Sequence, residues 1–241
     1  MSDEILRRHQ IIWEKKPVLR LLYRGWYGEM AGWLQPGRTL EVGGGTGNLK
    51  EFAPSVVCTD IVKLPWLDAV VDAQRLPFAK GSFANIVLFD ALHHIENVRY
   101  FFDEALRVLQ PEGRVIIMDP YISLCSWPVY RFLHAEPVDF SQDPLAQIPM
   151  QPDRKPYEAN QAIATILFER SSKRFHELYP SLKKLRHHRL AFLAYPLSGG
   201  FDHPSMIPMW MVRPVLILER LLDALSRYLA FRILVVLEKA C

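Results

Sequence analysis

The chain has 241 residues, of which 50% are hydrophobic and 23% are charged; this composition excludes a disordered protein and suits one α/β domain with a well-buried core. Its net charge of +3 is too small to indicate a nucleic-acid partner. The cysteines are scattered, without a C-x-x-C pair, which predicts reduced thiols. No stretch resembles a signal peptide or a membrane span, so we expect a cytoplasmic protein.

The first predicted element is helical and covers residues 4–34, where apolar side chains recur at helical intervals. Glycines loosen its second half. Pro36 and Gly37 separate this segment from the first predicted strand, at residues 38–42.

A glycine-rich run, TLEVGGGTG at residues 39–47, follows the first strand. After the acidic Glu41 come four glycines, Gly43, Gly44, Gly45 and Gly47. Glycine tolerates positive φ and lets a ligand lie against the backbone, so the run predicts a tight turn from strand to helix at a ligand site. The spacing is not that of a dinucleotide or phosphate loop. It resembles the first motif of the class I S-adenosylmethionine (SAM) dependent methyltransferases; a turn without a ligand is the alternative.

Polar residues follow each of the next predicted strands. A short helix over residues 48–52 leads to the strand 56–59, which ends at Asp60, a carboxylate able to accept hydrogen bonds from ribose hydroxyls. The brief strand 70–71 ends at Asp72 and Ala73. The apolar strand 84–89 ends at Asp90, and His93 and His94 come soon after.

Strands and helices continue to alternate, with a helix over residues 98–109 and a strand over 114–119, which indicates a doubly wound parallel sheet. The words LEVGGGTG, CTD, VVDAQRLPF, FDALHHI and VLQPEGRVIIMDP occur in order. Over residues 36–120 they resemble small-molecule methyltransferases of the ubiquinone/menaquinone-biosynthesis type.

This resemblance implies a Rossmann-like, seven-stranded sheet with an antiparallel last strand, and SAM as the cofactor. The cofactor contacts that it implies, together with the residues above, are Glu41, Gly43, Gly44, Gly45, Gly47, Asp60, Ile61, Asp72, Ala73 and Asp90. Asp60 would hold the ribose, Asp72 the adenine, and Asp90 the ammonium group. Residues 1–35 would form a helical lid, although its aromatic side chains could equally pack on the core.

The second half of the chain is rich in proline, which favours an irregular insertion. We interpret residues 121–185 as a cap over the acceptor pocket, containing a helix at 157–170. We then predict a strand at residues 190–197, a helical insertion at 203–229 with an amphipathic helix over 215–229, and a last strand at 231–238.

The predicted reaction moves a methyl group from SAM to an oxygen or nitrogen atom of a small or lipid-like acceptor. His94, and secondarily His93, could take a proton from the acceptor, or both could simply pack. His134, Glu136 and Asp139 are further polar groups of the cap that the sequence does not place. No metal-ligand spacing is evident, so no metal is expected.

Two surface features bear on partners. The basic residues of segment 173–189 are interpreted as a solvated face, so nucleic acid is not favoured as a partner. The segment 206–229 combines apolar residues with regularly spaced arginines and could touch an anionic membrane surface, or pack on the core. The alternative function is a non-catalytic scaffold or SAM-binding sensor; the sequence does not predict the oligomeric state.

Overall fold

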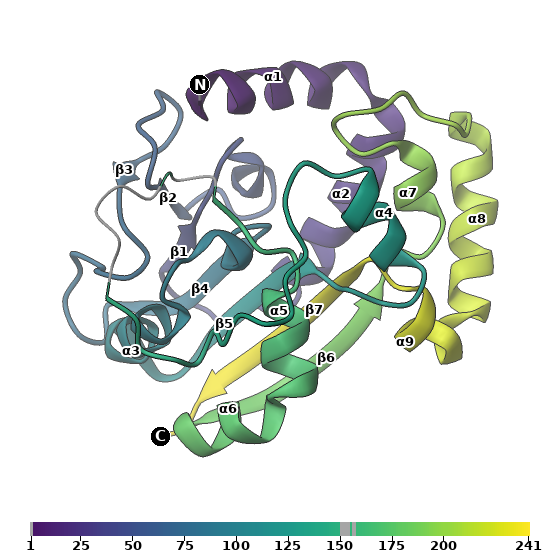
Figure 1. The fold of residues 1–241 in the computed structure, drawn as a ribbon. Coiled ribbons are helices and arrows are strands. Elements are labelled where there is room, and N and C mark those ends of the chain that lie inside the picture. The colour runs from purple at the N-terminus through teal and green to yellow at the C-terminus, as the bar shows by residue number, and fades with distance from the viewer. Residues whose placement is uncertain (1, 150–154, 156–157) are drawn as a thin grey trace.

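A seven-stranded sheet with the order β3-β2-β1-β4-β5-β7-β6 forms the centre of the molecule. The computed structural model describes residues 2–149, 155 and 158–241. The strands are β1 (Thr39–Val42), β2 (Val57–Asp60), β3 (Ala69–Val70), β4 (Phe83–Phe89), β5 (Leu109–Pro120), β6 (Leu182–Leu190) and β7 (Arg232–Lys239). The first five pair in parallel, and β7 runs antiparallel between β5 and β6 (Figure 1). The predicted class I fold with an antiparallel last strand is therefore confirmed.

Helices cover both faces of this sheet. They are α1 (Ser2–Lys15), α2 (Pro17–Ala31), α3 (Val98–Val108), α4 (Ser126–Phe132), α5 (Ile163–Thr165), α6 (Ser172–Leu178), α7 (Ala194–Ser198), α8 (Met209–Leu221) and α9 (Ser226–Leu229). Shorter turns are η1 (Asn48–Glu51), η2 (Leu92–His94), the π-helical η3 (Ile166–Arg170) and η4 (Asp223–Leu225). None of the helices in the described ranges is long and apolar enough to cross a membrane.

Alternating side chains of the buried strands feed two separate cores, because successive residues of a strand point to opposite faces. Ile86 and Leu88 of β4 pack in the core that holds α3, α5 and α6. Val87 and Phe89 pack in the core that holds α2 together with side chains of α7 and α8. Figure 1 shows α1 and α2 on the opposite side of the sheet from α3 and α6.

The sixth strand lies earlier than predicted. The prediction of a strand at residues 190–197 is wrong, since β6 covers Leu182–Leu190 and the apolar residues after it form α7. The strand β6 is at the edge of the sheet and pairs only with β7, so its charged side chains can remain in solvent. Ala191 then turns the chain with a positive φ of 65°. The irregular part of the predicted cap thus ends before Leu182 rather than at residue 185.

Three predicted helices have different bounds. The N-terminal helix is divided, because Pro17 begins α2 as its first residue, a position where proline is well tolerated. The helix predicted at residues 157–170 is helical only from Ile163 onward among the described residues, and Tyr157 lies outside them. The helix predicted at 215–229 begins earlier, as α8, and breaks after Leu221 into η4 and α9.

Candidate functional site

The glycine run forms a tight loop between β1 and η1. Gly43, Gly45 and Gly47 have φ angles of 70°, 46° and 75°, which glycine adopts without steric cost. Gly44 has no room for a side chain, because a Cβ atom would lie 2.3 Å from the Cys58 Sγ atom. The first three glycines line a large cavity, whereas Gly47 is not among the lining residues and closes the turn by donating to the Gly44 carbonyl at 2.7 Å.

Asp60, at the end of β2, holds the glycine loop in place. Its Oδ2 atom accepts from the Gly45 N–H at 3.0 Å, and its Oδ1 atom accepts from the Val62 N–H at 3.0 Å. Each carboxylate oxygen can accept a further hydrogen bond, and Asp60 faces the cavity. The adjacent Ile61 also lines the cavity, yet its side chain is 49% exposed. A polar acceptor and an apolar surface therefore lie side by side.

Glu41 lies beneath the loop with its side chain buried. It accepts a hydrogen bond from the Cys58 thiol at 2.7 Å. Burial raises the pKa of Glu41 to about 8, since a charged carboxylate is poorly solvated there. Glu41 consequently supports the loop as a largely neutral side chain at neutral pH.

The cavity has a volume of about 810 Å³ and joins two groups of predicted site residues. The first group is the glycine loop with Asp60, Ile61, Asp72 and Ala73, which the resemblance assigns to the cofactor. The second group is His93 and His94 with cap residues that include His134 and Glu136, and we call the part of the cavity that they line the acceptor end. Part of the wall comes from α1, and the size is in the range of small-molecule and cofactor sites.

Asp90, which also lines the cavity, forms a partly buried ion pair with Arg232 that the sequence did not predict. The Arg232 guanidinium of β7 contacts both carboxylate oxygens of Asp90, with Nη2–Oδ2 at 2.8 Å. Its Nη2 atom also lies 3.1 Å from the hydroxyls of Tyr23 and Tyr195. The rings of Tyr23, Trp26, Phe89 and Tyr195 surround the guanidinium, with centroids 4.6 to 5.4 Å away. Asp90 is thus already paired with a fixed cation.

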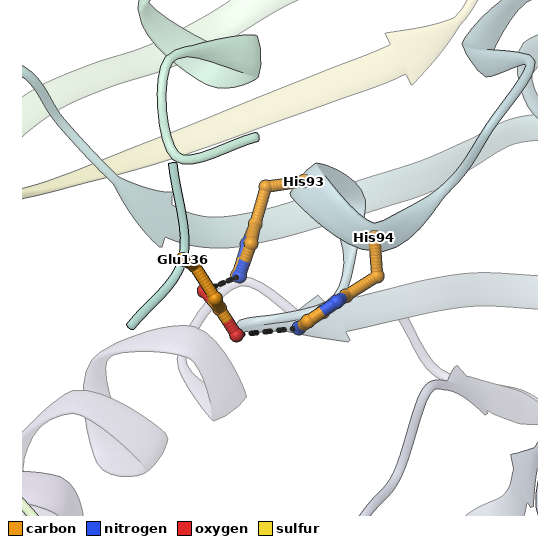
Figure 2. Close-up of side chains that lie close together, drawn as sticks. All are labelled: His93, His94 and Glu136. Atoms are coloured by element: carbon orange, nitrogen blue, oxygen red, sulfur yellow. Dashed lines mark ion pairs between the residues drawn. The ribbon is translucent and has the colours of Figure 1, made fainter. Parts of the chain in front are cut away.

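Two histidines and two carboxylates form a cluster at the acceptor end. The His93 Nδ1 atom lies 3.0 Å from Asp119 Oδ1, and its Nε2 atom lies 3.3 Å from Glu136 Oε2. The His94 Nε2 atom lies 3.6 Å from Glu136 Oε1. Figure 2 shows both imidazoles leaving the short turn η2 and converging on Glu136, which comes from the cap.

The two imidazoles of this cluster differ in protonation. Burial lowers the pKa of His93, but the carboxylates of Asp119 and Glu136 outweigh this effect and raise it to about 10. Burial and the neighbouring charge of His93 lower the pKa of His94 to about 3. One ring is therefore held as a cation by two carboxylates, and the other stays neutral.

A comparison with known protein families identifies the kind of domain that contains this cavity. Residues 40–117 match the family described as a methyltransferase domain. Residues 40–117, within the seven-stranded fold described above, are of the class I SAM-dependent methyltransferase type. The match includes the glycine loop, Asp60, Asp72 and both histidines after β4.

Relatives and solved structures agree with this methyltransferase domain. The ubiquinone/menaquinone biosynthesis C-methyltransferase UbiE of Dinoroseobacter shibae is 30% identical over 125 residues, covering 41% of this chain and 49% of that protein. The chain thus spans about half the length of the curated relatives it matches. A SAM-dependent methyltransferase of Archaeoglobus fulgidus aligns with a TM-score of 0.55 at 12% identity, covering 95% of this chain and 98% of that one. A SAM-dependent methyltransferase of Thermotoga maritima gives 0.52 at 12% identity, covering 99% and 97%. At such identities the likeness concerns the fold.

SAM is the cofactor that belongs to this domain, and the cavity has groups that fit it. Asp60 retains acceptor capacity for hydroxyls, and Ile61 offers an apolar surface for a ring. Asp72, whose Oδ1 atom accepts from the Gln74 N–H at 2.8 Å, faces the same space. The cavity therefore contains hydrogen-bond acceptors and an apolar surface of the kind that a nucleoside requires.

The cluster around His93 contains residues that sequence analysis did not connect. Asp119 ends β5 beside β4, and residues after parallel neighbouring strands meet at one sheet edge, so this contact could have been anticipated. Glu136 comes from an irregular part of the cap that has no periodic signal. Asp139, the other cap acid considered, instead accepts from Ser141 and is not among the cavity-lining residues. A metal was not expected from sequence, yet His93, His94 and Glu136 converge within metal-binding range.

Proposed function

We propose that the chain transfers the methyl group of SAM to an oxygen or nitrogen atom of a small or lipid-like acceptor that sits against His93, His94 and Glu136. The observation that carries this proposal is the single cavity joining the glycine loop to the histidine cluster. A methyl donor and an acceptor can meet there without crossing solvent. The UbiE relatives are named as C-methyltransferases, so methylation of carbon is the alternative outcome of an acceptor screen.

Bound SAM supplies an activated methyl group, so the protein must align the acceptor and keep water out. The glycine loop, Asp60 and Asp72 would orient the donor. Leu6 and His9 of α1 line the cavity, and the Gln10 side chain donates to the Thr46 carbonyl at 3.2 Å, which holds α1 over the loop. His94, which is neutral and therefore able to take a proton, would accept the acceptor proton. Its low pKa makes it a weak base, so the charge that forms would depend on stabilisation by Glu136, whose Oε1 atom lies 3.6 Å from His94 Nε2.

Cofactor binding is tested by thermal unfolding with SAM and with S-adenosylhomocysteine. Ligand at a hundred times its Kd adds about 2.7 kcal/mol, which for a domain of this size predicts a rise in Tm of roughly 5–10 °C. Asp60→Ala should lose this rise. Asp143→Ala, which removes an exposed ion pair with Arg174 outside the cavity, should keep it. Well-folded wild-type protein that shows no shift with either ligand would contradict SAM binding.

Turnover is tested separately, once an acceptor is found. His94→Gln should lower kcat by about 10²–10⁴-fold if His94 takes the proton, while the SAM-induced rise in Tm remains. SAM binding without turnover on any acceptor would favour the alternative, a sensor or scaffold.

A lipid-like acceptor gains support from the outer surface of α8. Trp210, Ile217 and Leu221 are 74%, 59% and 77% exposed and recur at seven and four residues, so they share one side of the helix. The exposed Arg213 and Arg220 border this side. Figure 1 shows α8 at the outer edge of the molecule. Peripheral contact with an anionic membrane through this surface is part of the proposed function.

A further inference from the structure

We propose that His93, His94 and Glu136 bind a divalent transition-metal ion of the zinc type at the acceptor end of the cavity. Two imidazoles and a carboxylate are a ligand set that such ions prefer. The binding of the ion stands on its own, whereas its role in catalysis rests on the proposed methyl transfer.

The spacing of the ligand atoms fits one ion. One ligand atom from each residue lies within 4.8 Å of the others. The separations from Glu136 oxygens to His93 Nε2 and His94 Nε2 are 3.3 and 3.6 Å. Two ligands at about 2.1 Å from a tetrahedral ion lie about 3.4 Å apart. The two nitrogen–oxygen separations match this spacing, although they involve different oxygens of Glu136, and the three ligand atoms, which lie within 4.8 Å, would have to move closer together around the ion.

The surroundings of the ligands resemble those of a built metal site. Metal-binding histidines usually donate their other ring N–H to a carboxylate, which fixes the tautomer and the ring orientation. His93 has this arrangement, since its Nδ1 atom faces the fully buried Asp119 and its Nε2 atom faces Glu136. On the far side, the Gln161 amide donates to Glu136 and orients the carboxylate. Both the imidazole and the carboxylate are therefore held by neighbours outside the ligand set.

The position of the cluster in the fold gives the ion access to the acceptor. The three ligands line the cavity that also contains the glycine loop. Three protein ligands with a fourth position open to a cavity are the pattern of catalytic rather than structural zinc sites.

The chemistry that follows defines the acceptor class as a molecule with a hydroxyl group. With its Nε2 atom on the ion, His94 would no longer serve as the base, and the ion would replace it in that role. A hydroxyl oxygen bound in the open position would lose its proton to solvent more readily, because the cation stabilises the oxyanion. The oxyanion then attacks the methyl carbon of SAM, an oxygen–carbon bond forms, and the carbon–sulfonium bond breaks. Its electron pair remains on sulfur, and S-adenosylhomocysteine leaves uncharged at that atom. No oxidant or second donor is required.

The alternative is that the cluster is only an ion-pair network, with a protonated His93 between two carboxylates. Metal binding distinguishes the two cases without SAM or an acceptor. The purified protein is dialysed against a chelator and titrated with Zn²⁺ in competition with a chromogenic chelator. We expect one tightly bound equivalent in the wild type and a tetrahedral visible spectrum after Co²⁺ substitution.

The variants His94→Gln and Glu136→Gln should each weaken Zn²⁺ binding by about 100-fold or more, and Asp119→Asn by about 10–100-fold. The matched control is His188→Gln. It removes another imidazole with a carboxylate neighbour, since His188 Nδ1 lies 3.0 Å from Glu29 Oε1, but it lies outside the cavity, so binding should not change. Far-UV circular dichroism checks that each variant folds. A His93→Gln variant could fail to fold because His93 is buried, so the test of the metal site depends on His94→Gln and Glu136→Gln.

A wild-type protein that retains no Zn²⁺, or one equivalent that persists unchanged in both His94→Gln and Glu136→Gln, would overturn the metal site. The SAM-induced rise in Tm is measured on the same samples. Wild-type protein that binds no zinc but still shows the SAM-induced rise in Tm would reject the metal site and leave the proposed methyl transfer in place. Zinc binding without any SAM response leaves the metal site in place and rejects the proposed methyl transfer.

Discussion

Two buried ionisable side chains, Glu41 and Arg232, lie at the base of the methyltransferase cavity. Burial disfavours a charge unless a partner compensates for it. Arg232 has such a partner in Asp90. Among the residues that the structure describes, the Cys58 thiol is the one hydrogen-bond donor to the Glu41 side chain, and Glu41 keeps its proton. A neutral side chain in place of Glu41 should therefore make the protein relatively more stable at high pH. A neutral side chain in place of Asp90, the partner of Arg232, should make it less stable.

Replacing Glu41 should remove a pH-dependent loss of stability. The folded protein retains the Glu41 proton up to about pH 8, whereas an unfolded glutamate releases it near pH 4.5. Stability from this group is therefore greatest below pH 4.5 and falls as the pH rises to 8. Glu41→Gln keeps an acceptor for Cys58, and its free energy of unfolding relative to wild type should rise by about 3 kcal/mol between pH 5 and pH 8. Urea unfolding at several pH values measures this, and parallel curves would contradict it.

Removing the charge of Asp90 should destabilise the protein strongly. Asp90→Asn leaves the Arg232 guanidinium, which is 2% exposed, without its counterion, at a cost of about 3–5 kcal/mol. Asn also tolerates the positive φ of 52° at this position, so backbone strain is not added. Arg232→Met should cost less, because the Asp90 side chain is 29% exposed.

A double-mutant cycle in urea isolates this pair. The double variant Asp90→Asn/Arg232→Met should lose less free energy of unfolding than the two single variants lose together. Strictly additive losses would show that the charges do not interact.

At the scale of the elements, continuous apolar runs in the sequence correctly predicted the buried strands. The strands β1, β4, β5 and β7 are buried along most of their length, so their hydrophobic sequences predicted them and the fold. The edge strand β6 contains the polar run KKLRHHR and was missed for the same reason. Strand propensity and hydrophobic periodicity reveal a strand mainly through its buried side chains. An edge strand is only partly buried, so this signal is weak.

The site was predictable where motifs follow strands and unpredictable where distant segments meet. Asp60 ends β2, Asp72 follows β3 by two residues, and the two histidines lie in the short turn η2 after β4, so their common edge of the sheet follows from topology. Arg232 reaches Asp90 across 142 positions of the chain. An arginine within the apolar sequence of β7 indicated that a buried counterion must exist. Nothing in the sequence indicated that this counterion is Asp90.

At the scale of the whole molecule, apolar surface is concentrated on neighbouring segments of the cap and the C-terminal helices. Trp127 and Phe132 of α4 are 43% and 69% exposed, and the adjoining Cys125 N–H donates to the Tyr228 carbonyl of α9 at 3.0 Å. Together with the outer side of α8 they form more exposed apolar surface than isolated residues on a soluble protein. Because the cap also contributes Glu136 to the cavity, membrane contact would bring a lipid-like acceptor near the site.

This surface predicts binding to anionic vesicles in a flotation assay. Trp210→Ser with Leu221→Ser should abolish flotation, because these side chains would enter the interface. Arg213→Gln with Arg220→Gln should weaken it by roughly 5-fold per arginine at low salt, since each cation near an anionic surface contributes about 1 kcal/mol. The effect of the arginines should shrink at high salt, where their attraction is screened. Val70→Ser, which removes a 54% exposed apolar side chain on β3, should float like the wild type. If wild-type protein stays with the dense fraction even at low salt, α8 does not bind membranes and the acceptor must reach the cavity from water.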